Sequence, residues 1–267
     1  MTAEASHTLG LRLIARTATV TVGAAGLLLG SLTLLHSSRG DPWPALSVAP
    51  GPAAAPSTAS RAPSATSDTT VQEPPSTAPT DRVSPAWAER VSEAAAIPYR
   101  ALLAYASADL TIDAEQPDCG IGWNTLAAIG AVESAHGYYS EGTLRDDGYP
   151  DPPIRGVALN GQGVAAIEDT DGGVLDGDTT WDRATGPLQF IPSTWETWGA
   201  DGNGDGVADP NQIDDAALAA ARYVCASGPV ITAAQWRQAV WSYNHSDDYV
   251  DRVAAIAHHY AVAVEAS

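Results

Sequence analysis

Lysine is absent from this 267-residue sequence, and positive charge is scarce throughout. Thirteen arginines face 32 aspartates and glutamates, which gives a formal net charge of −19. The whole excess of negative charge falls on residues 81–267, which contain 28 acidic residues and 9 arginines. Such a surface repels phosphate backbones, so we expect no nucleic-acid partner.

Cysteine is also scarce, since only Cys119 and Cys225 occur. Neither lies near the N-terminal apolar run, so we expect no lipid-modified cysteine as an anchor. No arrangement of histidines favours a catalytic cysteine. His258 and His259 are adjacent on an expected helix and point apart, which is poor geometry for sharing one metal ion. We therefore expect neither thiol nor zinc chemistry.

The N-terminal part contains a long apolar run. Arg12 and Arg16 precede residues 17–35, which carry no charge and would span about 30 Å as a helix, close to a bilayer core. Residues 1–39 are therefore predicted to be a signal-anchor or transmembrane segment with an extracytoplasmic C-terminal side. A cleaved signal peptide followed by secretion is the alternative.

Two further regions follow the apolar run. Residues 40–84 are rich in Pro, Ala, Ser and Thr, and we expect a disordered linker there. Residues 85–267 are long enough for one well-buried domain. Helical signals dominate that domain, including capping boxes at Ser193/Glu196 and Thr232/Gln235. The long stretch between Tyr138 and Thr185 is dense in Gly, Pro and Asp, and we interpret it as the wall of a groove that contains a small β-hairpin. The expected fold class is mainly α (α+β).

Glu133 is the most informative residue of the domain. Residues 120–137 are predicted to form one helix that ends at Gly137. Leu126 and Ile129 precede Glu133 by seven and four residues, so all three share the face that should turn inward. Burial would raise the pKa of the carboxyl group and favour the protonated form that a general acid needs. The alternative is a glutamate that is paired with an arginine or turned to solvent.

Three segments carry a family resemblance. VESAHG at residues 132–137 is followed by GPLQFIPSTW at residues 186–195 and by SYNHSDDY at residues 242–249. In this order and spacing they resemble the lytic murein transglycosylases, specifically the membrane-bound lytic transglycosylase B group and its actinobacterial relatives. The resemblance covers roughly residues 84–260 and implies a lysozyme-like domain.

The resemblance implies a reaction as well as a fold. A single acid/base, Glu133, would cleave the β-1,4 bond between N-acetylmuramic acid and N-acetylglucosamine in peptidoglycan and leave a 1,6-anhydromuramic acid end, with no cofactor for catalysis. Tyr249 would lie near the acid, and Ser134 would orient it. Two alternatives stay open, a hydrolytic muramidase and a non-catalytic, calcium-stabilised wall-binding module. The substrate-binding residues implied in this way are Ser134, Gln189, Tyr243, Asn244 and Tyr249.

The acidic segment 201–215 has the spacing of a calcium loop. Oxygen ligands fall at its first, third and fifth positions, and a backbone carbonyl falls at the seventh. Gln212 replaces the usual Glu at position 12, but the resemblance implies a longer loop that ends in a carboxylate at position 15. We expect a structural Ca²⁺, against the alternative of a solvated acidic turn. A second acidic stretch, residues 169–178, shows no comparable spacing and is interpreted as a solvated loop. The expected ligands are Asp201, Asn203, Asp205, Val207 and Asp215.

The remaining expectations concern partners and the cysteine pair. An exported domain with two cysteines favours a Cys119–Cys225 disulfide, and two separate buried thiols are the alternative. The implied partners are peptidoglycan glycan strands and, through residues 1–39, the cytoplasmic membrane. Because peptidoglycan is largely uncharged or anionic, affinity for it would come from hydrogen bonds and from the aromatic faces of eight Trp and nine Tyr.

Overall fold

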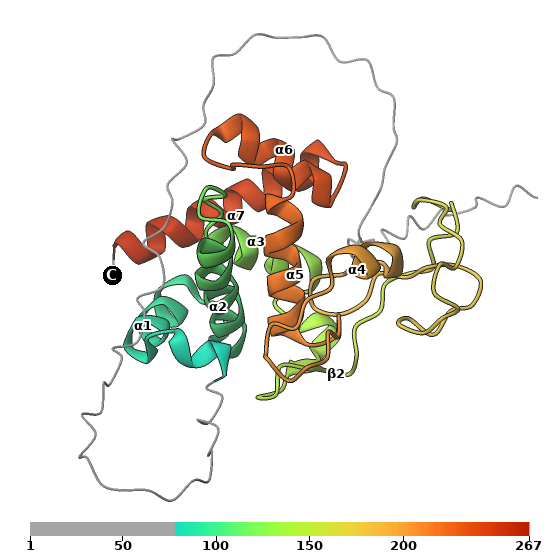
Figure 1. The fold of residues 1–267 in the computed structure, drawn as a ribbon, viewed down its shortest axis with the longest axis horizontal. Coiled ribbons are helices and arrows are strands. Elements are labelled where there is room, and N and C mark those ends of the chain that lie inside the picture. Colours follow the sequence, from blue (N-terminus) through green and yellow to red (C-terminus); the bar gives the residue numbers. More distant parts are fainter. Residues whose placement is uncertain (1–77, 267) are drawn as a thin grey trace, which may run out of the picture.

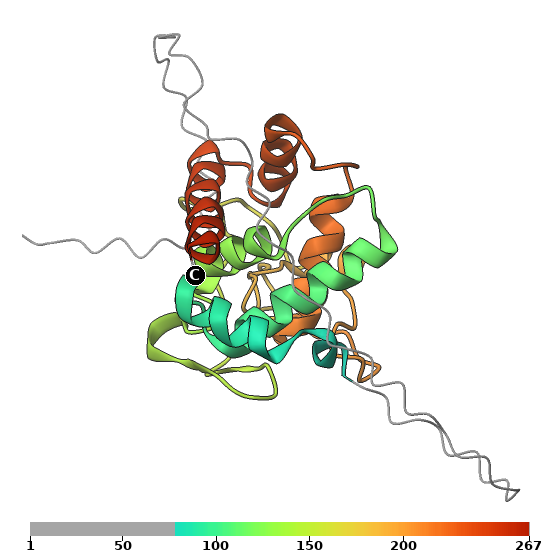
Figure 2. The same cartoon turned by 90° about the vertical axis from the view of Figure 1, so that its left-hand side faces the viewer.

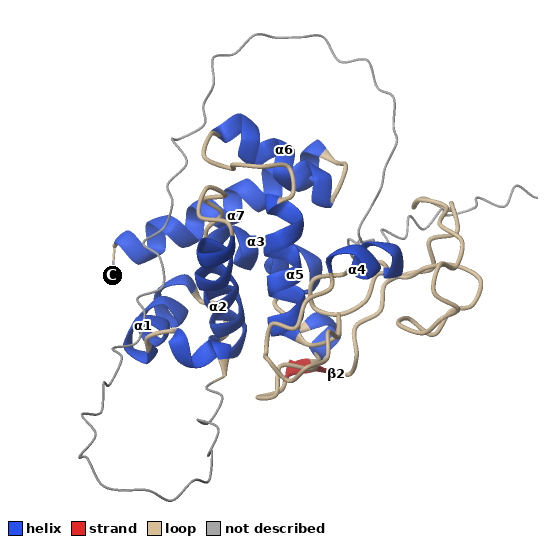
Figure 3. Cartoon of the chain, in the orientation of Figure 1, coloured by secondary structure: helices blue, strands red, loops and turns tan. Residues whose placement is uncertain are grey.

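The computed structural model describes residues 78–266 of the chain (Figure 1). The predicted anchor, residues 1–39, and residues 40–77 of the predicted linker lie outside the described residues. Within residues 78–266 there are seven α-helices and very little strand, as Figure 3 shows, which is consistent with the mainly α, lysozyme-like domain expected from the sequence. The helices are α1 (Pro85–Ala95), α2 (Tyr99–Glu115), α3 (Trp123–Ser134), α4 (Pro192–Trp198), α5 (Ile213–Cys225), α6 (Ala233–Tyr243) and α7 (Asp247–Glu265).

The folded part includes the end of the predicted linker. A 3-10 helix, η1, spans Pro79–Arg82, and Val83 is buried against the core. Both precede the domain start expected at residue 85. None of the helices within residues 78–266 has the length and apolar character needed to span a membrane.

Two helix pairs form the centre of the molecule. Helix α2 packs along α5, and α3 packs along α7, with α1 against α2 and α7 (Figures 1 and 2). The first pair is close because α5 presents small side chains: Ala217, Ala220 and Ala221 are fully buried. The disulfide expected from the sequence is present, and it joins Cys119, just before α3, to Cys225 at the end of α5.

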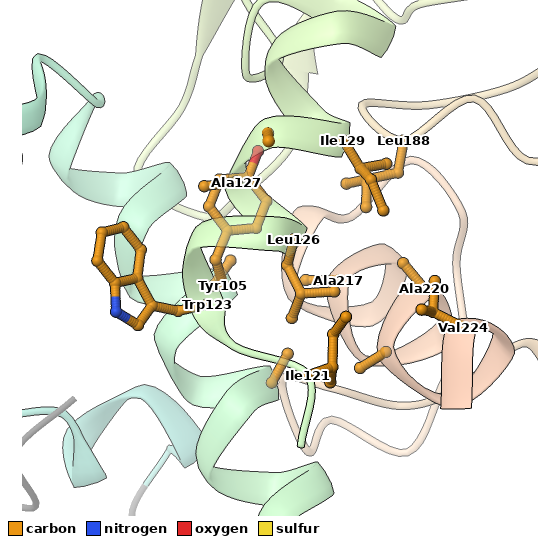
Figure 4. Packing of buried hydrophobic residues seen from close by; sticks show 14 of the residues in the cluster. Tyr105, Ile121, Trp123, Leu126, Ala127, Ile129, Leu188, Ala217, Ala220 and Val224 are labelled. Carbon is orange, nitrogen blue, oxygen red and sulfur yellow. The ribbon is translucent and has the colours of Figure 1, made fainter. Parts of the chain in front are cut away.

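Helix α3 lies within this core. Figure 4 shows Leu126 next to Ala217 of α5 and Ile129 next to Leu188, and all four residues are buried. Gly130 allows the close approach of α2, because a Cβ atom at this position would overlap the hydroxyl group of Tyr105. The inward face predicted from helical spacing is thus confirmed.

The ends of two helices differ from the prediction. Helix α3 ends at Ser134, before the expected Gly137, because Ala135 and His136 adopt positive φ angles of 52° and 64°. The buried His136 ring holds this turn through hydrogen bonds with Tyr105 (3.2 Å) and Tyr260 (3.1 Å). The capping box expected at Ser193/Glu196 is wrong, since Ile191 is the N-cap of α4 and makes no side-chain cap. The box at Thr232/Gln235 is confirmed at the start of α6.

A long segment without regular secondary structure lies on one side of the bundle. It follows a small antiparallel hairpin, β1 (Thr143–Leu144) paired with β2 (Pro150–Asp151), as expected from the sequence. Residues 152–191, here called the loop wall, then run to α4 without a helix or strand, and Figure 1 shows this yellow segment extending away from the helices. Scattered backbone hydrogen bonds hold it together, such as Leu159 N to Asp182 O (3.0 Å) and Asp182 N to Ile167 O (3.1 Å).

Candidate active site

A cleft of about 260 Å³ opens where the C-terminal end of α3 meets the loop wall and the end of α6. Glu133 lies in the last turn of α3, on the same face as the buried Leu126 and Ile129, and it is only partly buried because this end of the face reaches the cleft. The residues that line the cleft are Glu133, Leu159, Ile167, Ala184, Gln189, Phe190, Ile191, Thr194, Tyr223, Ser242, Tyr243, Asn244 and His245.

The carboxyl group of Glu133 has one hydrogen-bonded neighbour, Tyr249 of α7. The Tyr249 hydroxyl donates to Glu133 Oε1 at 2.6 Å, and the Tyr249 side chain is buried. Burial raises the pKa of Glu133 to about 7, whereas the Tyr249 hydrogen bond and the charge of Arg252 lower it by less. A substantial fraction of Glu133 is therefore protonated near neutral pH, as the sequence predicted.

Tyr243 and Asn244 reach the cleft from the end of α6. The Tyr243 hydroxyl donates to Leu188 O at 2.8 Å, which joins α6 to the loop wall. Burial and the neighbouring Glu133 raise the pKa of Tyr243 well above its usual value, so the phenol stays protonated. Asn244 is the C-cap of α6, and its Oδ1 atom is buried without a hydrogen-bond partner in the described structure. An unpaired acceptor beside the cleft is suited to accept a hydrogen bond from a bound ligand.

Gln189 comes from the loop wall in a left-handed backbone conformation, with φ of 52°. Its Nε2 atom donates to Gly186 O at 2.8 Å, which fixes the side chain at the cleft. Gly186 itself has a φ of 77°, and a Cβ atom there would overlap the Pro210 carbonyl. The tight turn thus positions Gln189 as a residue of the cleft lining.

Ser134 is not among the residues that line the cleft, and its expected role as a substrate-binding residue stays a prediction. Its buried hydroxyl donates to Pro187 O at 2.6 Å and accepts from Gly137 N at 2.8 Å. Both hydrogen bonds are to backbone groups, so Ser134 fastens the loop wall to the end of α3. Tyr249 also lies outside the cleft lining and acts on Glu133 directly.

Several lining residues were not expected from the sequence. Leu159, Ile167 and Ala184 come from the loop wall, and Tyr223 comes from the end of α5. Two short apolar segments, VALN at residues 157–160 and VAAI at residues 164–167, interrupt the Gly- and Asp-rich stretch. They were the sequence signal that loop residues could be buried. Tyr223 had no such signal, because it lies on a helix whose other face fills the core.

The predicted calcium loop, residues 201–215, turns its carboxylates toward its own backbone. Asp201 accepts from Gly204 N (2.7 Å) and Gly206 N (2.8 Å), and Asn203 and Asp205 make similar local bonds. Asp215 is buried and accepts from Gly202 N at 2.7 Å and from Asp209 N at 2.9 Å. Burial, with a smaller contribution from Asp201, raises the pKa of Asp215 to about 6. Within residues 78–266, Asp201, Asp205 and Asp215 do not form a close carboxylate group.

The second acidic stretch does bring carboxylates together. Oxygen atoms of Asp169, Asp171 and Asp182 lie within 4.8 Å of one another. Asp182 is fully buried and accepts from the backbone N–H (2.9 Å) and the hydroxyl (2.8 Å) of Thr170. Asp182 lies beyond the stretch 169–178 that we interpreted as a solvated loop. Within that stretch Asp176 is buried, so the interpretation is wrong for Asp176.

Comparison with protein families gives one match. Residues 164–230, about a quarter of the chain, match the Transglycosylase SLT domain. The match includes Gln189, α4, the acidic loop 201–215 and α5, but neither α3 with Glu133 nor α6 and α7. It supports a domain of the lytic transglycosylase type, which acts on peptidoglycan, without specifying the membrane-bound B subgroup. Comparisons with curated proteins and with solved structures found no match.

Proposed function

We propose that this chain is a lytic transglycosylase that uses Glu133 as its single acid/base to cleave the β-1,4 bond between N-acetylmuramic acid and N-acetylglucosamine. The product end would be 1,6-anhydromuramic acid. The domain would act outside the cytoplasmic membrane, where peptidoglycan lies, with residues 1–39 as its anchor. The observation that carries the proposal is that Glu133 is the one carboxylate among the described residues that line the cleft.

A single carboxylate limits the chemistry available. Most glycoside hydrolases use two carboxyl groups, about 5 to 9.5 Å apart, that flank the scissile bond. The lining of this cleft supplies one, and its pKa of about 7 lets it exchange a proton in either direction near neutral pH. A reaction in which the substrate supplies its own nucleophile needs no second carboxylate.

The proposed reaction has two proton transfers, and both involve the carboxyl group of Glu133. Protonated Glu133 donates to the glycosidic oxygen, and the bond from that oxygen to C1 of the muramic acid breaks with assistance from the N-acetyl group. The resulting Glu133 carboxylate then accepts the proton of the C6 hydroxyl while the C6 oxygen bonds to C1 and displaces the assisting acetamido oxygen. The Tyr249 hydroxyl, 2.6 Å from Oε1, stabilises the carboxylate between these steps.

The polar residues of the cleft are suited to an acetamido sugar. The buried, unpaired Oδ1 of Asn244 can accept a hydrogen bond from an acetamido N–H group. Gln189 offers its Oε1 atom, since its Nε2 atom is bound to Gly186. Tyr243 lines the same cleft and is held to the loop wall by its hydrogen bond to the Leu188 carbonyl.

We also propose that the loop 201–215 binds a structural Ca²⁺. The expected ligand atoms are all oxygens, which hard cations prefer. The loop also contains a buried carboxylate, Asp215, whose hydrogen bonds come from backbone N–H groups and whose pKa is raised toward protonation. A bound cation would favour the ionised form of this group. The proposed ligands are Asp201, Asn203, Asp205, the Val207 carbonyl and Asp215.

Product analysis tests the reaction. The full-length chain is incubated with purified peptidoglycan, and soluble products are measured by mass spectrometry. We expect anhydromuramic ends, which are one water lighter than hydrolytic products and have no reducing end. Glu133→Gln should lower the cleavage rate on the order of 100- to 10,000-fold, because the nearly isosteric amide can neither donate nor accept the proton.

Two outcomes would redirect the proposal. Reducing ends in the wild-type digest indicate attack by water and a muramidase. Binding of peptidoglycan without any cleavage by the wild-type chain indicates the wall-binding module. Glu93→Gln, at an exposed position on α1, provides the same carboxylate-to-amide change outside the cleft lining, and its cleavage rate should stay close to that of the wild type.

A further inference from the structure

Trp241 is a large aromatic side chain left open to solvent beside the cleft. It lies on α6 directly before Ser242, which lines the cleft, and its side chain is 43% exposed. Most tryptophans bury far more of their surface, because a buried indole removes a large apolar area from water. An exposed indole next to a ligand cleft therefore indicates a contact surface for a ligand.

His245 connects this indole to the cleft. Its ring lies 4.2 Å from the Trp241 ring, at an interplanar angle of 87°, and His245 also lines the cleft. The two rings come from α6 and from the turn that follows it, so the edge-to-face contact holds the indole against a residue of the cleft lining. The aromatic surface is thus continuous from the cleft lining to Trp241.

The cleft is too small to enclose a polymeric substrate, so such a substrate would also contact the surface outside the cleft. Pockets that enclose a drug-sized ligand have volumes of about 300 to 1,000 Å³. The cleft, at about 260 Å³, holds the sugars next to Glu133 and leaves the rest of a glycan strand outside. The strand must continue over the rim of the cleft.

The charges around Trp241 favour an uncharged ligand. The cation one turn earlier on α6, Arg237, is paired with Asp251 at 2.7 Å and lies 3.8 Å from Asp247. Its positive charge is thus already offset by two carboxylates. A sugar ring, with an apolar C–H face and a hydroxylated edge, matches an exposed indole in a polar surrounding better than an anionic peptide does.

We propose that Trp241, held by His245, forms a subsite that packs against the face of a sugar ring in the part of the glycan strand that extends beyond the cleft. This proposal rests on the proposed function, since it assumes a glycan strand in the cleft. The subsite adds affinity for long strands and none for a disaccharide bound next to Glu133.

The test compares ligand lengths. The full-length chain carrying Glu133→Gln is titrated with peptide-free peptidoglycan strands and, separately, with the N-acetylglucosamine–N-acetylmuramic acid disaccharide. Adding Trp241→Ala should weaken strand binding on the order of tenfold and leave disaccharide binding unchanged, because only the strand reaches the indole. Trp241→Phe, which keeps an aromatic face, should restore most of the loss. Tyr99→Ala, at a 40% exposed aromatic residue on α2 outside the cleft lining, should have no effect.

Each other result overturns the subsite. Equal strand affinity with and without Trp241 removes it, and an equal loss for strand and disaccharide means that the substitution has altered the cleft itself. A change in oligomeric state on Trp241→Ala means that the indole packs against a second copy of the chain. Cleavage assays on chains with Glu133 intact separate this proposal from the first, because the subsite can fail while anhydromuramic products still form.

Discussion

The helical bundle and the acidic loops of this domain are held together by different forces. In the bundle, residues such as Leu126 and Ile129 are fully buried, and burial of apolar surface is the main stabilising contribution. In the loop wall, carboxylates accept hydrogen bonds from the backbone: Asp176 bonds the N–H groups of Asp178 (2.9 Å) and Arg183 (2.6 Å). Hydrogen bonds to charged side chains thus stabilise the loops, whereas burial of apolar side chains stabilises the bundle.

The helical bundle and the loop wall also contribute different residues to the cleft. The bundle supplies the acid, Glu133, and the tyrosine that contacts it, on helices α3 and α7. The loop wall supplies the opposite lining, including Gln189 and the apolar Leu159 and Ile167. The proposed acid is therefore on the helical side of the cleft, and the opposite lining comes from the loop side.

The largest stability effect is expected on the bundle side, at the Cys119–Cys225 disulfide. The bond closes a loop with a sequence separation of 106 residues, so replacing both cysteines by serine should lower the free energy of unfolding by up to about 4–5 kcal/mol in the chain-entropy model. Urea unfolding of the variant and the wild type measures this. Reduction of the wild type should give a similar loss, and an unchanged unfolding midpoint in both samples would contradict the prediction.

Calcium should act on the loop side alone. An ion that binds only the folded state stabilises by about 2.7 kcal/mol at 100 times its dissociation constant, so calcium should raise the melting temperature relative to chelator. Asp201→Ala should abolish this increment. Asp171→Ala, in the other acidic loop, is the matched control and should retain it. If both variants respond to calcium like the wild type, the ion does not bind in the loop 201–215.

A smaller effect is expected from Gly130→Ala in the bundle. The added Cβ would overlap the Tyr105 hydroxyl, which in turn is hydrogen-bonded to His136. Overpacking of this kind lowers the free energy of unfolding by about 1–3 kcal/mol, and thermal or urea unfolding measures the change. Combining it with Tyr105→Phe removes the clashing oxygen and should recover part of the loss. Wild-type stability in the single variant would mean that α2 and α3 can move apart freely.

The subtlest effect concerns the pH dependence of cleavage. In the proposed reaction protonated Glu133 is the acid, so we expect cleavage to fall as pH rises through about 7. The Tyr249 hydroxyl lowers the pKa of Glu133 because it stabilises the carboxylate. Tyr249→Phe should therefore raise this pKa and move the alkaline limb of the pH–rate profile to higher pH. A limb that moves to lower pH, or does not move, would show that another group controls it.

The sequence predicted the parts of the molecule that follow a regular spacing. The inward face of α3 was predictable because Leu126, Ile129 and Glu133 repeat at helical intervals, and the Thr232/Gln235 box was predictable because capping depends on local residues alone. The end of α3 could not be predicted, because it depends on contacts of His136 with Tyr105 and Tyr260, which are distant in the sequence.

The loop side shows a different limit of sequence analysis. The spacing of Asp201, Asn203 and Asp205 predicted a metal site, yet the close carboxylate group is the one formed by Asp169, Asp171 and Asp182. Asp182 joins that group through folding of the loop wall, which no periodic pattern encodes. The contact of Ser134 with the loop wall was not predicted for a similar reason, because Pro187, the partner of its hydroxyl, lies in a distant segment.

Two hydrogen bonds fasten the loop wall next to the acid, from Ser134 to the Pro187 carbonyl and from Tyr243 to the Leu188 carbonyl. They secure only the short stretch beside Glu133. Over evolutionary time, insertions and deletions elsewhere in residues 152–185 can therefore accumulate at a small entropic cost without displacing the catalytic geometry. Under the proposed function, descendants of such a domain can diverge in the glycan strands that they accept while the helices around Glu133 stay the same.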